Sequence, residues 1–471
     1  MLVIWLLLLG ASFQDPEQVD SQALEWFYKG QELTGTELEY AREQEEFFEK
    51  AVELAPDFAE ARYNLAVIYI QQKRTEAALQ QLSAWIDLEL EDPRGYLLRA
   101  RLRMEEDRLD GAAQDLQQAL TLDAGNHEAW QWLGRIHYRQ ERYQKADQAF
   151  HQALQLSPGS AATYFDLALV QHALARKEEA IAHYLKFLNH FPDDFQANYY
   201  LGLIYRETGQ DDLALKHFLR AEKKEPDQRE LLEQLGNLYL DRNNLEEARA
   251  RLLRADQESV INLANLGVIA KREGQNDLAL EYFERALHGE PHDALIWAHQ
   301  GDVLAQMERN QEAVKAYQNA LRYNPEDLNT LYNLGTLYVH LKRPREALDL
   351  LQGGLTREPC HGQLHYATAV VLDQMQDFDR AEIHYQRSID CGAQEPFAHL
   401  RLAFLLARKG NRTGALNHLI AALEERPDEY VPVVVSELRK VHSDLDSIRY
   451  TDDFRRLLSK YQVRSDSQDP G

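Results

Sequence analysis

The sequence predicts an all-α solenoid, a single quasi-linear domain built from tandem helix hairpins. A glycine column recurs with a spacing of 34 residues or its multiple, shortened once to 31, at Gly134, Gly202, Gly236, Gly267, Gly301 and Gly335. An alanine column follows twelve residues downstream, at Ala146, Ala214, Ala248, Ala279, Ala313 and Ala347. Apolar residues around both columns follow the 3.6-residue period of a helix. A repeat of this length predicts paired helices that bury their apolar faces by stacking on neighbouring pairs.

One copy carries the repeat most completely. Residues 127–160 contain, in order, Trp130, Leu133, Gly134, His137, Ala146, Phe150, Ala153 and Pro158. This closely resembles the tetratricopeptide repeat (TPR) pattern of W-x2-L-G-x2-Y, then A-x3-F, then P. The resemblance implies a right-handed α-solenoid of about 12 tandem TPR helix hairpins over residues 25–429, followed by a C-terminal helical cap.

Each column of the repeat has a physical reason. Positions 4, 7, 8 and 11 lie on one stripe of the first helix (helix A) and face the second (helix B). Small residues at positions 8 and 20 let the helix axes cross closely, and aromatic residues at position 24, such as Phe150, fill the remaining space. Proline at position 32 ends helix B. Turns such as 209–211 and 274–276 join helix A to helix B.

The array has irregular copies. The first repeat, 25–58, is degenerate, with Gly35 interrupting its first half. The repeat at 229–259 is three residues short, and we expect the shortening to fall after Ala255, in the link to the next repeat. Residues 430–462 predict two capping helices, with Leu438, Phe454 and Leu458 on their apolar face, and 463–471 predict a disordered tail.

Composition excludes several function classes. The net charge of −25 argues against sequence-independent nucleic-acid binding, which needs a basic surface, and against adhesion to anionic lipid.

Residues 1–12 resemble a signal peptide, which predicts export to a periplasmic or secreted location; a cytoplasmic location is the alternative. Their apolar run is shorter than the roughly 20 residues that a stable membrane span needs.

No catalytic motif is present. The chain has no phosphate-binding loop, zinc-protease helix or nucleophile elbow, and after the repeats no stretch remains that could hold a catalytic domain of about 100 residues. We therefore expect no enzyme activity and no cofactor. Cys360, His361, His365 and Cys391 have residue types that bind zinc, but His365 occupies position 4 and is expected to pack on its own helix B, so no metal site is predicted.

The candidate binding surface is the face of helix A formed by positions 2, 5, 6, 9, 12 and 13, which lines the concave groove in TPR arrays. Aromatic and arginine residues there are the types that most often dominate protein–protein binding, and Trp132 and Arg135, one turn apart, are expected to form an aromatic–cation pair. Position 6 resembles, incompletely, the asparagine ladder with which the TPRs of O-linked N-acetylglucosamine transferase clamp a peptide backbone. The candidates are Tyr63, Asn64, Trp132, Arg135, Phe165, Asp166, Tyr199, Arg206, Asn265, Tyr332, Asn333 and Tyr366.

The two cysteines, Cys360 and Cys391, flank the hairpin 362–395. Antiparallel helices would bring these two ends within the ~4.4–6.8 Å between Cα atoms that a disulfide needs. The alternative is a pair of small, semi-buried thiols.

These features predict a non-catalytic scaffold that binds an extended peptide or a partner protein in the concave groove. The alternative is a regulatory or substrate-recruiting subunit of a separate enzyme or assembly complex. The sequence does not specify the oligomeric state.

Overall fold

The computed structural model describes residues 19–33, 41–392, 397–440 and 442–461. Three predictions from the sequence lie outside the described residues: the signal peptide at 1–12, the tail at 463–471 and the interruption at Gly35. Across the described residues every regular element is a helix, so the predicted all-α solenoid is confirmed. None of these described helices combines the length and apolar composition needed to cross a bilayer.

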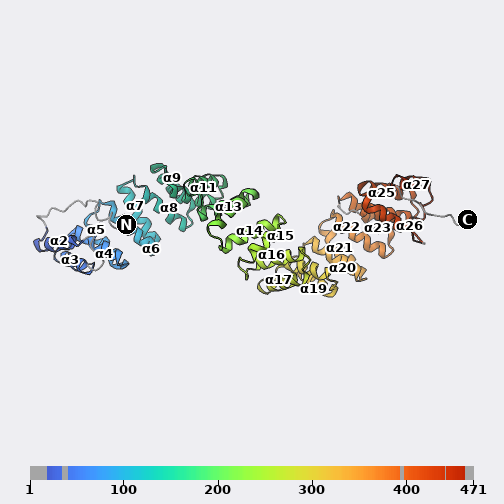
Figure 1. Cartoon of the computed structure of the whole chain (residues 1–471), viewed down its shortest axis with the longest axis horizontal. Helices are drawn as coiled ribbons and strands as arrows, with labels where there is room; N and C mark the ends of the chain where they lie inside the picture. Colours follow the sequence, from blue (N-terminus) through green and yellow to red (C-terminus); the bar gives the residue numbers. More distant parts are fainter. Residues whose placement is uncertain (1–18, 34–40, 393–396, 441, 462–471) are drawn as a thin grey trace. The chain divides into compact units, whose positions relative to one another are not determined.

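The chain divides into two compact units, Met1–Pro226 and Asp227–Gly471. Within each unit, consecutive helices pack in pairs, a helix A followed by its helix B (Figure 1). The first unit contains α2 (Ser21–Glu32), α3 (Ala41–Leu54), α4 (Ala59–Gln71), α5 (Thr75–Leu88), α6 (Pro93–Glu105), α7 (Leu109–Leu122), α8 (His127–Arg139), α9 (Tyr143–Leu156), α10 (Ala161–Ala173), α11 (Lys177–His190), α12 (Phe195–Glu207) and α13 (Asp211–Lys224).

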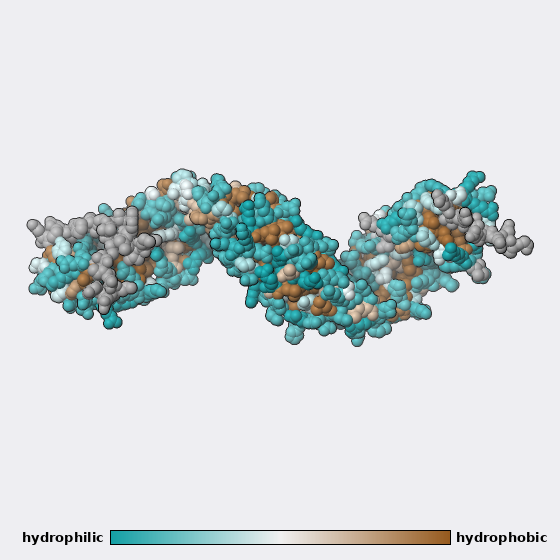
Figure 2. Space-filling view, viewed as in Figure 1, coloured by the Kyte–Doolittle hydropathy of each residue, from teal (hydrophilic) through white to brown (hydrophobic). Residues whose placement is uncertain are grey.

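The second unit contains α14 (Arg229–Asp241), α15 (Leu245–Leu252), α16 (Val260–Arg272), α17 (Asn276–Gly289), α18 (Ala294–Gln306), α19 (Asn310–Tyr323), α20 (Leu328–His340), α21 (Pro344–Arg357), α22 (Gly362–Gln374), α23 (Phe378–Asp390), α24 (Ala398–Arg408), α25 (Arg412–Glu425), α26 (Pro427–Leu438) and α27 (Asp452–Lys460). The visible face in Figure 2 is mostly hydrophilic with separate hydrophobic patches, in keeping with the net charge of −25.

The repeat columns act in packing as the sequence predicts. A Cβ atom added to Gly134 would lie 2.6 Å from the ring of Phe150, and one added to Gly267 would lie 2.5 Å from the ring of Phe283. Such distances are far inside van der Waals contact, so only a very small residue fits at position 8 opposite these rings. Both phenylalanine rings are fully buried.

The turns between helices A and B share one conformation. Position 15 of the repeat adopts a left-handed backbone at Gly209 (φ 71°) and Gly274 (φ 74°), and equally at Ala175 (φ 58°). This conformation ends helix A and brings the chain back toward helix B. Side chains of aspartate, asparagine or serine cap the start of many A helices, as Asp194 does by accepting from the Ala197 N–H.

The shortened repeat differs in part from the prediction. Helix B ends early here: α15 has 8 residues, whereas α13 and α17 each have 14. Because Ala255 stays buried at position 27 and α16 begins at Val260, the missing residues fall after Ala255, as expected, but the early end of helix B was not predicted. Leu252 and Ala255 remain buried at positions 24 and 27. Because helix α15 ends at Leu252, the residues that follow are extended enough to reach the start of α16 although the repeat is three residues short.

The first hairpin also differs in register. Helix α2 begins at Ser21, capped by Asp20, four residues before the expected start of the repeat at 25. Gly30 then takes the place of the position-8 residue, because a Cβ there would lie 2.7 Å from the ring of Phe48. The helix-crossing contact is thus preserved despite the degenerate sequence.

The C-terminal helices share a core with the last hairpins. Phe454 and Leu458 of α27 and Tyr430 of α26 are buried in one cluster with residues of α22 to α25. Phe404, at a groove position of α24, is 4% exposed in this cluster. Arg408 binds Asp373 at 2.9 Å and Asp444 at 2.8 Å, which ties α22, α24 and the segment before α27 together.

Candidate functional site

The predicted groove residues all lie on A helices, in α4, α8, α10 and α12 of the first unit and α16, α20 and α22 of the second. Arg135 is exposed, Asp166 is buried, and the other ten candidates are half-buried. This face is therefore partly accessible along its length, as a binding surface must be. Side-chain contacts decide which of these residues remain available to a ligand.

Asp166 is the centre of a polar cluster in the first unit. Its Oδ2 accepts from Gln131 Nε2 at 2.7 Å and from Arg135 Nε at 3.0 Å, both on the preceding helix A. Burial raises the pKa of the Asp166 carboxyl, and the charge and hydrogen bonds of Arg135 oppose that rise. Arg135 is therefore bound to Asp166, and the expected aromatic–cation pair with Trp132 is replaced by this ion pair.

Aromatic rings form a connected row beside this cluster. The ring of Phe165 lies 5.8 Å from that of Tyr184, Tyr184 lies 6.2 Å from Tyr200, and Tyr200 lies 5.7 Å from Tyr199. Phe165 and Tyr199 are thus brought together through two tyrosines from α11 and α12. Tyr63 is not part of this row, since its ring packs on Trp85 of α5 at 4.7 Å.

The second unit contains a comparable network around Asp302 of α18. Asp302 Oδ2 accepts from Lys271 Nζ at 2.9 Å, and Oδ1 accepts from Tyr317 OH at 2.8 Å and Asn333 Nδ2 at 3.1 Å. Burial opposes ionisation here, but the hydrogen bonds from His299 and Lys271 outweigh it and lower the pKa of Asp302 to about 2. The carboxylate is therefore ionised at neutral pH.

These networks share one contact rule. Position 9 of one repeat binds position 6 of the next: Arg135 with Asp166, Asn237 with Asn265 at 2.6 Å, and Asp302 with Asn333. We call this the 9–6 contact. The asparagines expected to face a peptide backbone at positions 265 and 333 are therefore donors to a neighbouring repeat. Asn237 and Asp302 were not among the predicted candidates, although position 9 lies on the predicted face, because asparagine and aspartate side chains were singled out there only at position 6.

Two hollows adjoin on the groove face of the second unit. The first, about 500 Å³, is lined by Asp302, Ala305, Glu308, Asn310, Tyr317, Asn333, Thr336, Leu337 and His340. The second, about 580 Å³, is lined by Thr336, Val339, His340, Lys342, Tyr366, Ala367, Val370, Gln374 and Arg401. Thr336 and His340 line both. Asn333 and Tyr366, predicted from the sequence, thus belong to adjacent hollows that are lined mainly by positions 5, 6, 9, 12, 13 and 15.

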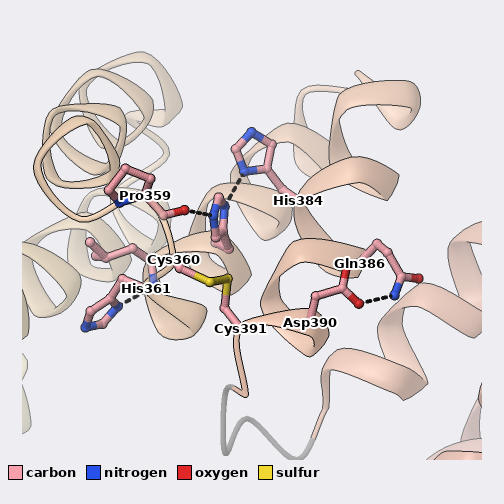
Figure 3. The surroundings of a disulfide bond; sticks show 9 residues. Pro359, Cys360, His361, His384, Gln386, Asp390 and Cys391 are labelled. Carbon is pink, nitrogen blue, oxygen red and sulfur yellow. Dashed lines mark hydrogen bonds between the residues drawn. A yellow bond between two sulfur atoms is a disulfide. The ribbon is translucent and has the colours of Figure 1, made fainter.

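The cysteines form a disulfide. The sulfur atoms of Cys360 and Cys391 are bonded, with their Cα atoms 5.3 Å apart, and they join the start of α22 to the end of α23 (Figure 3). Their sulfurs are consequently not available as thiolate ligands. Among the described residues no group of three or more His, Cys, Asp or Glu side chains is arranged to hold a metal ion.

The neighbouring histidines are structural. His365 Nε2 lies 3.0 Å from the carbonyl oxygen of Pro359, and its Nδ1 lies 2.9 Å from Nδ1 of His384 (Figure 3). Since only an N–H can donate to a carbonyl, Nδ1 of neutral His365 accepts from His384. Burial is the largest cause that lowers the pKa of His384 to about 4, and nearby positive charge adds to it. As predicted, His365 packs on its own helix B.

Family models described as tetratricopeptide repeat or TPR repeat match residues 45–102, 127–160, 165–229, 212–260, 233–295, 264–313, 301–341 and 332–396. Together they cover well over half of the chain. The chain belongs to the tetratricopeptide repeat family. As an array of TPRs it is a protein-interaction scaffold, a class that is generally non-catalytic.

Three solved structures match the chain over part of its length. PilF of Pseudomonas aeruginosa is 24% identical over 44% of this chain and 97% of its own, with a TM-score of 0.40. A chain of the APC/C hetero-tetramer Cut9–Hcn1 is 15% identical over 82% of this chain and 97% of its own, with a TM-score of 0.43. YrrB, described as a TPR protein with an unusual peptide-binding site, is 21% identical over 42% of this chain and 96% of its own, with a TM-score of 0.34. No curated protein gives a significant sequence match.

Proposed function

We propose that this TPR protein is a non-catalytic scaffold that binds an extended peptide, or an extended segment of a partner protein, along the groove face of its A helices. The observation that carries the proposal is the pair of adjoining hollows of about 500 and 580 Å³ in the second unit. Residues of two A helices, α18 and α20, line the first hollow, and residues of three, α20, α22 and α24, line the second. A ligand in both hollows would therefore contact at least three repeats. Recognition by many weakly contributing repeats is the mode that suits an extended ligand.

The second hollow is lined by both apolar and polar side chains. Val339, Ala367 and Val370 offer apolar contact for side chains, whereas His340 and Gln374 offer polar groups for a peptide backbone. The side chains of His340 and Gln374 are exposed and form no hydrogen bond or ion pair with other described residues. They are therefore available to a ligand.

Position-specific photocrosslinking tests the site. A photoreactive phenylalanine at Tyr366, on the groove face of α22, is compared with one at Ile383, which is 53% exposed on α23 of the same hairpin. We expect a partner to be crosslinked from position 366 and not from position 383. Equal crosslinking from both positions, or crosslinking from 383 alone, would remove the groove assignment.

The captured partner then allows a test in the first unit. If its binding extends there, Trp132→Ala is expected to weaken affinity by ~2 kcal/mol or more, the loss of one strong anchor. An unchanged melting temperature is the control for folding. Addition of the scaffold to a partner enzyme separates the two forms of the proposal, because a recruiting subunit changes the enzyme's turnover of its substrate and a passive scaffold does not.

We also infer that the protein is exported. The apolar segment at 1–12 and the Cys360–Cys391 disulfide support this independently, since disulfides persist in oxidising compartments. Non-reducing peptide mass spectrometry of the protein from fractionated native cells tests the inference. Two free thiols in a cytoplasmic fraction would refute it.

A further inference from the structure

The two hollows of the second unit differ in charge. The carboxylates of Asp302 and Glu308 line the first, and no lysine or arginine does. Lys342 and Arg401 line the second, and no carboxylate does. In a chain with 77 acidic and 52 basic residues, a hollow lined only by basic charged groups is a local reversal of the overall balance.

Arg401 is the decisive residue of the second hollow. Several other arginines on A helices are paired with a carboxylate, as Arg135 is with Asp166 and Arg408 is with Asp373 and Asp444. The Arg401 guanidinium is exposed and has no acceptor among the described residues, and neither has the exposed ammonium of Lys342. Unpaired donors over an apolar floor of Val339, Ala367 and Val370 are complementary to a carboxylate that stands next to an apolar side chain.

We propose that the second hollow binds an aspartate or glutamate side chain of an extended peptide, with Arg401 as its principal ion-pair partner and Lys342 supporting it. An apolar residue adjacent to that carboxylate packs on Val370. This inference rests on the proposed peptide-binding function and adds the chemistry of the ligand. Asp302 does not compete for the two cations, because Lys271, Tyr317 and Asn333 already occupy its oxygens.

Selection from a displayed library of random heptapeptides tests the proposal. The full chain is compared with Arg401→Glu and with Arg412→Glu, which makes the same charge change at an exposed residue at the start of α25 in the same hairpin. We expect the wild type and Arg412→Glu to enrich peptides with an aspartate or glutamate beside an apolar residue. Arg401→Glu is expected to lose this preference and to enrich lysine or arginine instead.

The highest-ranked acidic peptide is then synthesised with a fluorophore, together with a form in which the carboxylate is an amide. By fluorescence anisotropy, Arg401→Glu and the amide peptide are each expected to weaken binding about tenfold or more, and combining them is expected to cost little further. Because Arg401 is exposed, its substitution leaves the core intact, and a thermal melt checks this.

The outcomes distinguish the carboxylate site from the proposed peptide-binding function on which it rests. Peptides that are enriched without an acidic residue, but lose binding when Val370→Trp fills the hollow, would leave the proposed function standing and overturn the carboxylate site. Equal binding of the acidic and amide peptides would also overturn it. Failure to enrich any peptide would count against both.

Discussion

The Cys360–Cys391 disulfide should stabilise one hairpin of the second unit and leave the first unit unaffected. The bond joins residues 31 apart in sequence. In the chain-entropy model, a loop of that length lowers the entropy of the unfolded chain by about 12 cal/mol/K, which corresponds to about 3.7 kcal/mol at 25 °C. Because repeats in a solenoid pack mainly on their immediate neighbours, the effect should be strongest in α22 and α23.

The double variant Cys360→Ser/Cys391→Ser measures this contribution, and wild type treated with a reductant is its matched control. In hydrogen exchange, amides of α22 and α23 should lose protection by an amount that approaches this free energy, up to the limit set by the stability of the unit. Amides of α8 and α9 in the first unit should not change. Unaltered protection in α22 and α23 would refute the reasoning, and an equal loss in both units would show that the bond acts globally.

Four further predictions concern a repeat column, a turn and the two carboxylate networks. Gly267→Leu should destabilise the second unit by about 1–3 kcal/mol in urea unfolding, because its side chain would overlap the buried ring of Phe283. Ala175→Gly should stabilise the first unit by about 1 kcal/mol, because alanine holds a left-handed turn (φ 58°) that glycine adopts without strain. Asp302→Asn should lower the free energy of unfolding by about 2 kcal/mol at pH 7, because it removes an ionised carboxylate that the folded protein stabilises. Wild type should lose this stability as the pH falls from about 4 through the folded pKa of about 2, and the variant should not. Asp166→Asn should cost much less at pH 7, because burial raises the pKa of Asp166 and so makes its charged form less favourable in the folded protein than in water; equal costs for the two asparagine variants would contradict this distinction.

Most of the fold followed from local columns of the sequence. The glycine of position 8 and the aromatic residue of position 24 belong to the same hairpin, so the contact of Gly134 with Phe150 depends only on a fixed spacing along the chain. The hairpins at both irregular repeats were harder to predict. In the first, helix α2 is shifted and Gly30 replaces the regular position; in the other, α15 gives up helical residues while Leu252 and Ala255 remain buried. In both repeats the burial of core residues determines where the helices begin and end, and the spacing of the columns along the sequence does not indicate this.

The candidate site was predicted less completely than the fold. The choice of helix-A positions placed Asn333 and Tyr366 correctly at the hollows. The choice of residue types favoured aromatic rings and arginines, and it overlooked Asp302 because a single aspartate on a helix face usually points to solvent. Only the approach of the next repeat shows that Asp302 and Asn333 bind each other. Contacts between repeats depend on how the hairpins stack, which one repeat's sequence does not encode.

The 9–6 contacts limit how this groove can recognise a ligand. Where Asp302 and Asn333 bind each other, a ligand that used these groups would first have to break a hydrogen bond between repeats. Such pairs therefore hold neighbouring A helices in register, and their contribution to affinity is to keep the surface preorganised. New polar contacts must come from side chains outside the network, which in the second hollow include His340, Lys342, Gln374 and Arg401. Selectivity in the second unit thus depends on a few residues of α20, α22 and α24, and most of the groove face serves to fix their positions.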